Sequence, residues 1–186
     1  MPKIENAKII VLATHGFEQS ELEVPRDKLR EAGAEVHVVS PDGEDIKGWD
    51  DKDWGRIATV DHALGDVKIE GYDALVLPGG QINPDILRTI PEAVALVQAA
   101  HRAGKVIAAI CHAPWMLVEA GIVKGRAVTS YPSIKTDVVN AGGKWEDSEV
   151  ATDQGIITSR NPGDLDAFVA KIIEEIEEGE HDRKAA

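Results

Sequence analysis

The chain contains only one cysteine, Cys111, among its 186 residues. A single thiol excludes an intrachain disulfide and a metal site built from several cysteines, and an unpaired thiol is typical of the reducing cytosol. The six histidines are scattered, and none forms the HExxH pattern of a zinc enzyme. No GxGxxG stretch and no phosphate-binding loop occur either. We therefore expect a protein without a bound metal or cofactor.

Basic residues are also scarce, with 20 Lys and Arg against 33 Asp and Glu and a net charge of -13. Nucleic acids and anionic lipid surfaces both require a basic footprint, so neither is an expected partner. Long hydrophobic runs are missing as well. The apolar run 9–13 near the N-terminus is too short for a signal peptide or a membrane span. These features predict a cytoplasmic protein.

The length suits one domain, 1–186, with a core over about 7–178 and a tail at 179–186. Apolar runs rich in β-branched residues alternate with segments of helical spacing. The predicted strands are 8–14, 35–40, 74–77, 106–110, 127–130, 149–152 and 156–159. The predicted helices are 19–32, 91–103, 114–120, 134–141 and 165–178. Residues 41–66 lack helical spacing and are interpreted as a hairpin or excursion at the sheet edge. This alternation predicts an α/β fold with a mostly parallel sheet covered by helices on both faces.

Three separate segments bring polar or glycine-rich chemistry to one end of this predicted sheet. Glu18, the pair Gly79-Gly80 and Cys111 each follow a predicted strand. Ligands of open α/β sheets bind beyond the carboxyl ends of the strands. We therefore expect the functional site there.

Cys111 ends the apolar strand VIAAI and precedes a predicted helix. Small residues two positions away on either side, Ala109 and Ala113, allow the sharp turn on which a nucleophile is presented. The start of a helix favours the thiolate, so Cys111 is a candidate nucleophile, although buried structural cysteines are common. His112 follows directly, and at a sharp turn its imidazole could reach a substrate or simply face solvent.

Glu18 is a candidate to contact the thiol, with a plain acidic residue at a helix start as the alternative. Glu21 and Glu23 are expected to act only as such helix-start acids. Gly79-Gly80 can present a backbone N–H to a bound oxygen or form a simple tight turn. Tyr131 could bring its hydroxyl to the same edge, or pack half-buried.

Together these residues resemble the PfpI family of intracellular cysteine peptidases (peptidase C56-like), within the ThiJ/PfpI superfamily. The resemblance lies in the stretches GFEQSEL, YDALVLPGG, VIAAICHAPWML, GRAVTSYPSIKTDVVNAGGKW and ITSRNPGDL. It implies a flavodoxin-like three-layer sandwich with a cysteine nucleophile elbow and a homodimer or higher homo-oligomer with the site near the interface. It also implies Cys111 as nucleophile, His112 as its partner, Glu18 beside the thiol, and an oxyanion site at the Gly80 and His112 N–H groups.

In such proteins an acidic residue from a neighbouring subunit completes the site, and Asp85 is the matching position. Here the residue is Asp instead of Glu and its loop is one residue longer. We therefore expect a weaker interaction of this carboxylate with His112 across the interface. Ala113 also replaces the glycine common after the Cys-His pair.

The resemblance implies a cysteine-dependent hydrolase, either peptidase-like or acting on glycated or dicarbonyl substrates in stress defence. Its substrate would be a small carbonyl compound or a peptide. The alternative is a non-enzymatic redox-sensing stress protein or chaperone that uses oxidation of Cys111. A class I glutamine amidotransferase shares the nucleophile turn. It is disfavoured because, beyond His112, the only later histidine is His181 near the end of the chain.

Overall fold

The structure is a computed structural model that describes residues 3–179. A central seven-stranded sheet has the order β10-β11-β7-β6-β1-β2-β5, and every pairing is parallel except that of β10 with β11. The strands of this sheet are β1 (Lys8–Leu12), β2 (Glu35–Ser40), β5 (His62–Ala63), β6 (Ala74–Leu77), β7 (Val106–Ile110), β10 (Ala151–Asp153) and β11 (Ile156–Ser159).

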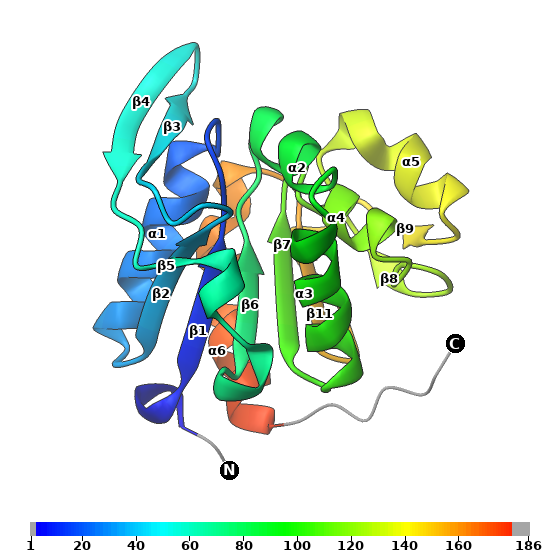
Figure 1. Cartoon of the computed structure of the whole chain (residues 1–186). Helices are drawn as coiled ribbons and strands as arrows, with labels where there is room; N and C mark the ends of the chain where they lie inside the picture. The colour runs from blue at the N-terminus through cyan, green and yellow to red at the C-terminus, as the bar shows by residue number, and fades with distance from the viewer. Residues whose placement is uncertain (1–2, 180–186) are drawn as a thin grey trace.

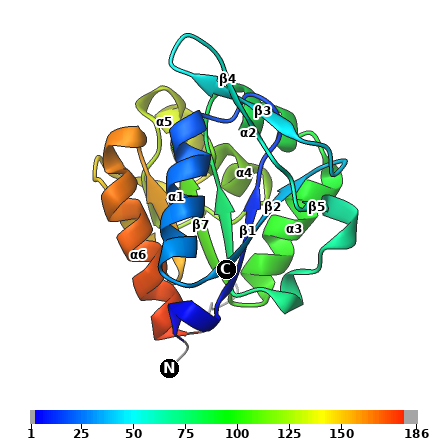
Figure 2. The ribbon, with the colours of Figure 1, turned by 90° about the vertical axis from the view of Figure 1, so that its left-hand side faces the viewer.

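Helices cover both faces of the sheet, as Figures 1 and 2 show. The α-helices are α1 (Gln19–Glu31), α2 (Ile82–Leu87), α3 (Pro91–Arg102), α4 (Pro114–Glu119), α5 (Lys135–Asn140) and α6 (Leu165–Glu178). Short 3-10 helices span Ile4–Asn6, Leu64–Asp66, Ile69–Gly71, Pro132–Ile134 and Pro162–Asp164. The sheet between two helical layers is the predicted flavodoxin-like sandwich.

Alternation along the central strands divides the core into two halves. In β1, Ile9 and Val11 belong to the cluster under α1 and α6, whereas Ile10 and Leu12 belong to the cluster under α3 and α4. Side chains of a strand point to opposite faces in turn, so a strand buried on both faces must be apolar throughout. All five residues of β7 are buried. This placement puts Cys111, the residue after β7, at the carboxyl end of the sheet.

Three minor elements differ in the structure from what the sequence specifies. The 41–66 segment does form a hairpin, of β3 (Ile46–Asp50) and β4 (Asp53–Ala58), but this is a separate two-stranded sheet. It stands above the end of the main sheet (Figure 1), and only the short β5 reaches the sheet edge. The strand expected at 127–130 is β8 (Ala127–Val128), which pairs with β9 (Lys144–Trp145) outside the main sheet.

The third difference is α2, which follows the double glycine and was not predicted. It holds only six residues, too few for a clear helical period, and it contains Pro84. Within residues 3–179, no helix is both long enough and apolar enough to cross a membrane. The predicted tail, 179–186, lies outside the described residues except for Gly179.

Candidate active site

Cys111 lies on a sharp turn between β7 and α4. Its φ of 64° is in the left-handed region, which is unusual for any residue other than glycine. Two backbone hydrogen bonds fix this turn: the Cys111 N–H donates to the Ser159 carbonyl at 3.0 Å, and the Tyr131 N–H donates to the Cys111 carbonyl at 2.7 Å. Ala109 and Ala113 are fully buried, as the tight turn requires. The predicted nucleophile turn is therefore present.

The His112 imidazole is in contact with the thiol. Its Nδ1 lies 3.2 Å from Cys111 Sγ, and its Nε2 lies 3.1 Å from the Ser133 hydroxyl. The Tyr131 ring stacks on the imidazole with ring centres 4.7 Å apart, and the Trp115 ring meets it edge-on at 5.3 Å. Burial lowers the pKa of His112 below its usual 6.5, so the ring is neutral at pH 7 and can accept a proton.

The carboxyl group that interacts with the thiol belongs to Glu21, which the sequence analysis expected to act only as an acid at the helix start. Glu21 is fully buried on α1, and its Oε2 accepts a hydrogen bond from the Gly79 N–H at 2.8 Å. Burial, and then the charge of Glu18, raise the pKa of Glu21 to about 8. It is therefore protonated at neutral pH. Its Oε1 makes no conventional hydrogen bond, and the neighbouring Cys111 thiol interacts with this carboxyl group.

Glu18 lies one helical turn before Glu21, at the residue preceding α1. It lines the pocket and is only partly buried, and its pKa is raised by burial and then by the charge of Asp50. The expected carboxylate contact to the thiol is thus made by Glu21. The proximity of Glu21 to Glu18, three positions earlier at the helix start, is the signal that could have identified it.

The double glycine has two different roles. The Gly79 N–H is used by Glu21, so it does not face an oxyanion. A Cβ at Gly79 would lie 2.4 Å from Glu21 Oε2 and 2.6 Å from Cys111 Cβ. Gly80 has a φ of +78°, and a Cβ there would lie 2.5 Å from the Gly16 carbonyl oxygen. Of the pair, only Gly80 directs its N–H towards Cys111, together with the His112 N–H.

Burial, and then the charge that Glu21 carries once it ionises, raise the pKa of the Cys111 thiol above its usual value. The N–H groups of Gly80 and His112 lower it, but by less. The thiol is therefore favoured over the thiolate expected at a helix start, because Cys111 is only 6% exposed and α4 is a short helix. His112 Nδ1, 3.2 Å from the sulfur, is the neighbouring group that can accept the thiol proton.

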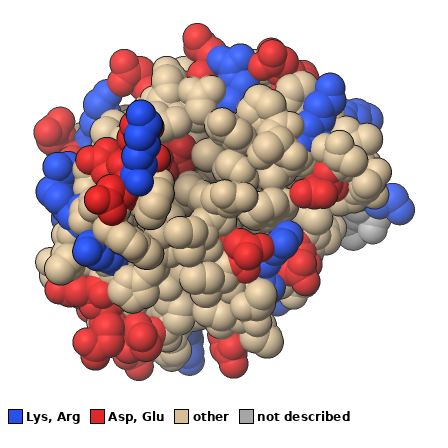
Figure 3. All heavy atoms as spheres, turned by 90° about the horizontal axis from the view of Figure 1, so that it is seen from above, with Lys and Arg blue, Asp and Glu red and all other residues tan. Residues whose placement is uncertain are grey.

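A pocket of about 620 Å³ opens over Cys111. Its walls come from the loop before α1, the β3–β4 hairpin, the start of α2 and the nucleophile turn. The lining residues are Gly16, Glu18, Glu21, Trp49, Asp50, Asp51, Gly80, Gln81, Ile82, Cys111, His112, Tyr131 and Pro162. Lys and Arg do not occur among them. Seen from above, acidic side chains gather on one side of a hollow, with a basic side chain in front of them (Figure 3).

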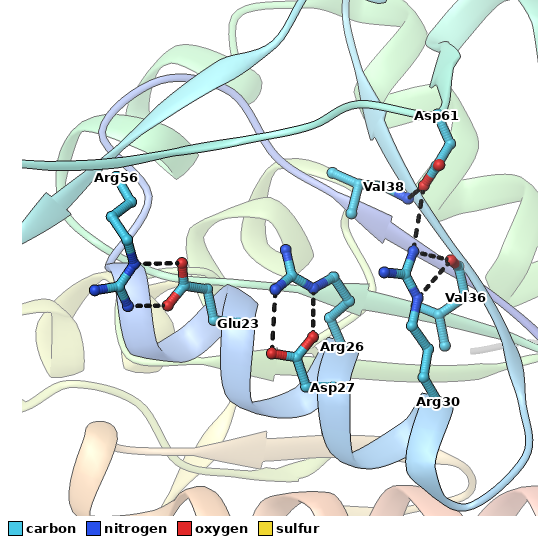
Figure 4. A network of polar contacts seen from close by, with 8 residues as sticks. All are labelled: Glu23, Arg26, Asp27, Arg30, Val36, Val38, Arg56 and Asp61. Carbon is cyan, nitrogen blue, oxygen red and sulfur yellow. Dashed lines mark hydrogen bonds and ion pairs between the residues drawn. The ribbon is translucent and has the colours of Figure 1, made fainter.

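The acidic wall of this pocket is supplied by the hairpin, which α1 holds in place. The Trp49 N–H donates to the Phe17 carbonyl at 2.7 Å, and the Arg56 N–H donates to Gln19 Oε1 at 2.6 Å. Glu23 forms an ion pair with Arg56 of β4 (Figure 4). The same figure shows further polar contacts along α1, between Arg26 and Asp27 and between Arg30, Val36 and Asp61.

The remaining predicted site residues lie at the rim. Tyr131 meets His112 with its ring, and its side chain is exposed. Asp85 is an exposed residue of α2, and its Oδ1 lies 2.8 Å from Arg88 Nη2. Arg88 in turn lies over the Trp115 ring at 4.5 Å. Asp85 thus lies on the surface, and its action from a neighbouring subunit stays a prediction.

Among residues 3–179, no group of three His, Cys, Asp or Glu side chains could bind a metal ion.

Comparison with known proteins agrees with this fold. The family model described as "DJ-1/PfpI family" matches residues 7–175. The chain belongs to the DJ-1/PfpI family. Deglycase TK1284 of Thermococcus kodakarensis is 41% identical over 166 residues, which cover 89% of this chain and 97% of that protein. Protein/nucleic acid deglycase 2 of Escherichia coli is 40% identical over 163 residues, covering 87% of this chain and 92% of that protein.

Among solved structures, the DJ-1beta protein of Drosophila melanogaster superposes with a TM-score of 0.83 at 32% identity, covering 96% of this chain and 95% of that chain. The resemblance to PfpI-type proteins and the flavodoxin-like fold are both confirmed. Several DJ-1/PfpI members carry the name deglycase.

Proposed function

We propose that the protein is a cysteine-dependent deglycase, which removes dicarbonyl adducts from amino or guanidino groups. The observation that carries this proposal is the Cys111 thiol, 3.2 Å from the neutral His112 Nδ1, at the base of a pocket of about 620 Å³. The names of the related deglycases support the same reaction class.

The chemistry follows from the positions of these groups. Methylglyoxal forms a carbinolamine with an amine, and its aldehyde-derived carbon then bears both nitrogen and hydroxyl. Sγ of Cys111 bonds to this carbon as the carbon–nitrogen bond breaks, and His112 passes the thiol proton to the leaving nitrogen. In the enzyme-bound hemithioacetal, the proton on the sulfur-bearing carbon moves to the adjoining carbonyl carbon and the hydroxyl proton moves to that carbonyl's oxygen, which gives a thioester of lactate. Water releases lactate and restores the thiol, so adduct and water give amine and lactate.

Two backbone N–H groups can donate hydrogen bonds to the substrate oxygen atoms during these reaction steps. The Gly80 and His112 N–H groups are directed at the sulfur, so an oxygen on the attacked carbon lies near both. The protonated Glu21 next to the thiol places no second negative charge beside the developing thiolate. Its raised pKa therefore favours nucleophilic attack at neutral pH.

The pocket wall favours cationic substrates. Glu18, Asp50 and Asp51 line it without a lining Lys or Arg, although Asp51 has Lys52 at 3.9 Å. An adduct on arginine or lysine brings positive charge or a donor to this wall, whereas an anionic carbonyl compound meets repulsion. Trp49 adds an aromatic face against which a guanidinium can stack.

A redox sensor is less well supported. Oxidation requires the thiolate, and burial raises the pKa of the Cys111 thiol. Peptide hydrolysis is a second use of the same nucleophile, but it must expel a poor amine leaving group. The partner acid expected to hold His112 for that step, Asp85, pairs with Arg88 within its own chain.

The test uses the methylglyoxal adduct of Nα-acetylarginine, with an excess of a scavenger that removes free methylglyoxal. The wild type should release lactate and Nα-acetylarginine faster than the adduct dissociates spontaneously, and Cys111→Ser should fall to the spontaneous rate. Asp50→Asn should weaken the preference for this adduct over the anionic adduct of glutathione. Release no faster than dissociation would refute deglycation, and cleavage of a fluorogenic peptide by the wild type would support the peptidase reading.

A further inference from the structure

His112 has a hydrogen-bonding partner at each ring nitrogen within one chain. Nδ1 faces Cys111 Sγ at 3.2 Å, and Nε2 faces Ser133 Oγ at 3.1 Å. Ser133 belongs to the 3-10 helix Pro132–Ile134, which follows Tyr131. The Tyr131 N–H bonds the Cys111 carbonyl, so the segment that carries Ser133 is tied directly to the nucleophile turn.

We propose that Ser133 is a positioning residue that holds His112 with its Nε2 protonated and its Nδ1 free to take the thiol proton. This inference rests on the proposed function, because it concerns the same thiol–imidazole pair. A neutral imidazole has one N–H and one lone pair. If Nδ1 is to accept from the thiol, the hydrogen must be on Nε2, and the Ser133 oxygen is the acceptor at that position.

The aromatic rings around His112 do not determine which way its imidazole is flipped, so the hydrogen bond to Ser133 must do so. Tyr131 covers one face at an interplanar angle of 23°, and Trp115 meets the imidazole at an angle of 62°. Such contacts restrict tilting of the ring, but they do not distinguish one ring nitrogen from the other. Only the polar partners at Nδ1 and Nε2 do so. A ring turned over would place carbon atoms opposite Sγ and Oγ.

Ser133 occupies the position where a partner subunit's acid was expected to act. Asp85 lies on the surface of α2, paired with Arg88, whereas the Ser133 hydroxyl already bonds Nε2. A hydroxyl orients the imidazole without adding a charge. Within one chain, the Ser133 hydroxyl therefore already provides a partner for Nε2.

The test compares Ser133→Ala with Ser133→Thr, which keeps a hydroxyl. Ser133 is exposed, so neither change disturbs the core. Ser148→Ala is a matched control, since that hydroxyl bonds only Glu146 and the Val150 carbonyl. On the arginine adduct, Ser133→Ala should lower kcat about fivefold to tenfold, the range of one neutral hydrogen bond, with KM unchanged. Ser133→Thr should restore most of the loss, and Ser148→Ala should match the wild type.

Nitrogen NMR of the histidine ring gives a readout that requires no substrate. The wild type should show a protonated Nε2 and a bare Nδ1 for His112. Ser133→Ala should shift both signals towards those of a mobile imidazole, and Ser133→Thr should resemble the wild type. A protonated Nδ1 in the wild type, or an unchanged spectrum in Ser133→Ala, would overturn the inference. If the wild type turns over no adduct while the spectra behave as expected, the proposed function fails and the role of Ser133 stands.

Discussion

Replacing Glu21 by Gln should stabilise the protein at neutral pH. Glu21 is fully buried, and its pKa in the folded state is about 8 against an ordinary value of 4.5. In the unfolded chain the carboxyl group is ionised at pH 7, so folding must take up a proton. Each pH unit above 4.5 costs about 1.4 kcal/mol of folding free energy, which amounts to about 3 kcal/mol at pH 7. Gln keeps the shape of the side chain, and its oxygen can still accept from the Gly79 N–H.

The effect of Glu21 on the stability of the fold depends on pH. A folded pKa above the unfolded value means that the contribution of Glu21 to stability is complete below pH 4.5 and falls as pH rises to about 8. Above that pH the loss levels off. The difference between Glu21→Gln and the wild type should therefore be small at pH 4.5, grow steadily towards pH 8, and then stay constant.

Denaturation with guanidinium chloride from pH 4.5 to 8.5 measures this difference directly, because other titrating groups cancel between the two proteins. Glu23→Gln is the matched control, since Glu23 lies on the same helix but pairs with Arg56 at the surface. Its stability difference should stay within about 1 kcal/mol at every pH. A Glu21→Gln difference that does not change with pH would show that Glu21 is ionised in the native protein and would refute the reasoning.

Three further predictions concern the same site and its assembly. Gly79→Ala should destabilise the protein by about 1–3 kcal/mol in urea unfolding, because its Cβ would overlap Glu21 and Cys111, and an unchanged midpoint would contradict the packing. The rate of Cys111 alkylation by iodoacetamide should still be rising above pH 9, since the pKa of the thiol is raised, whereas a plateau below pH 8 would indicate a thiolate. Sedimentation should show at least a dimer at micromolar concentration, and a 20 kDa monomer would remove any role for Asp85 from a neighbour.

Much of the fold could be predicted because buried strands and amphipathic helices carry strong sequence patterns. Strands 35–40, 74–77 and 106–110 match β2, β6 and β7 to the residue, and helix 165–178 matches α6. The carboxyl ends of these strands then place Cys111 and the double glycine together. The hairpin and β8 were harder to place, because pairing outside the main sheet depends on contacts distant in sequence, such as the bridge of Glu18 with Trp49.

The details of the site depended on side-chain orientation, which no pattern in a single sequence specifies. Glu18 lies just before α1 and Glu21 in its first turn, and only packing decides which carboxyl is buried against the thiol. Burial also outweighs the helix start in setting the protonation of Cys111. Ser133 lies 21 positions beyond His112 in the stretch SYPSIK, and no local spacing connects a serine there to the imidazole.

In the proposed reaction, Cys111 forms a covalent bond with the dicarbonyl unit during turnover. Rapid-quench mass spectrometry of the reduced protein mixed with the arginine adduct tests for this bond most directly. The peptide that contains Cys111 should carry one dicarbonyl unit, which disappears at the rate at which lactate is released, and Cys111→Ser should carry none. Lactate release by the wild type without this intermediate, or with equal speed in Cys111→Ser, would contradict the account.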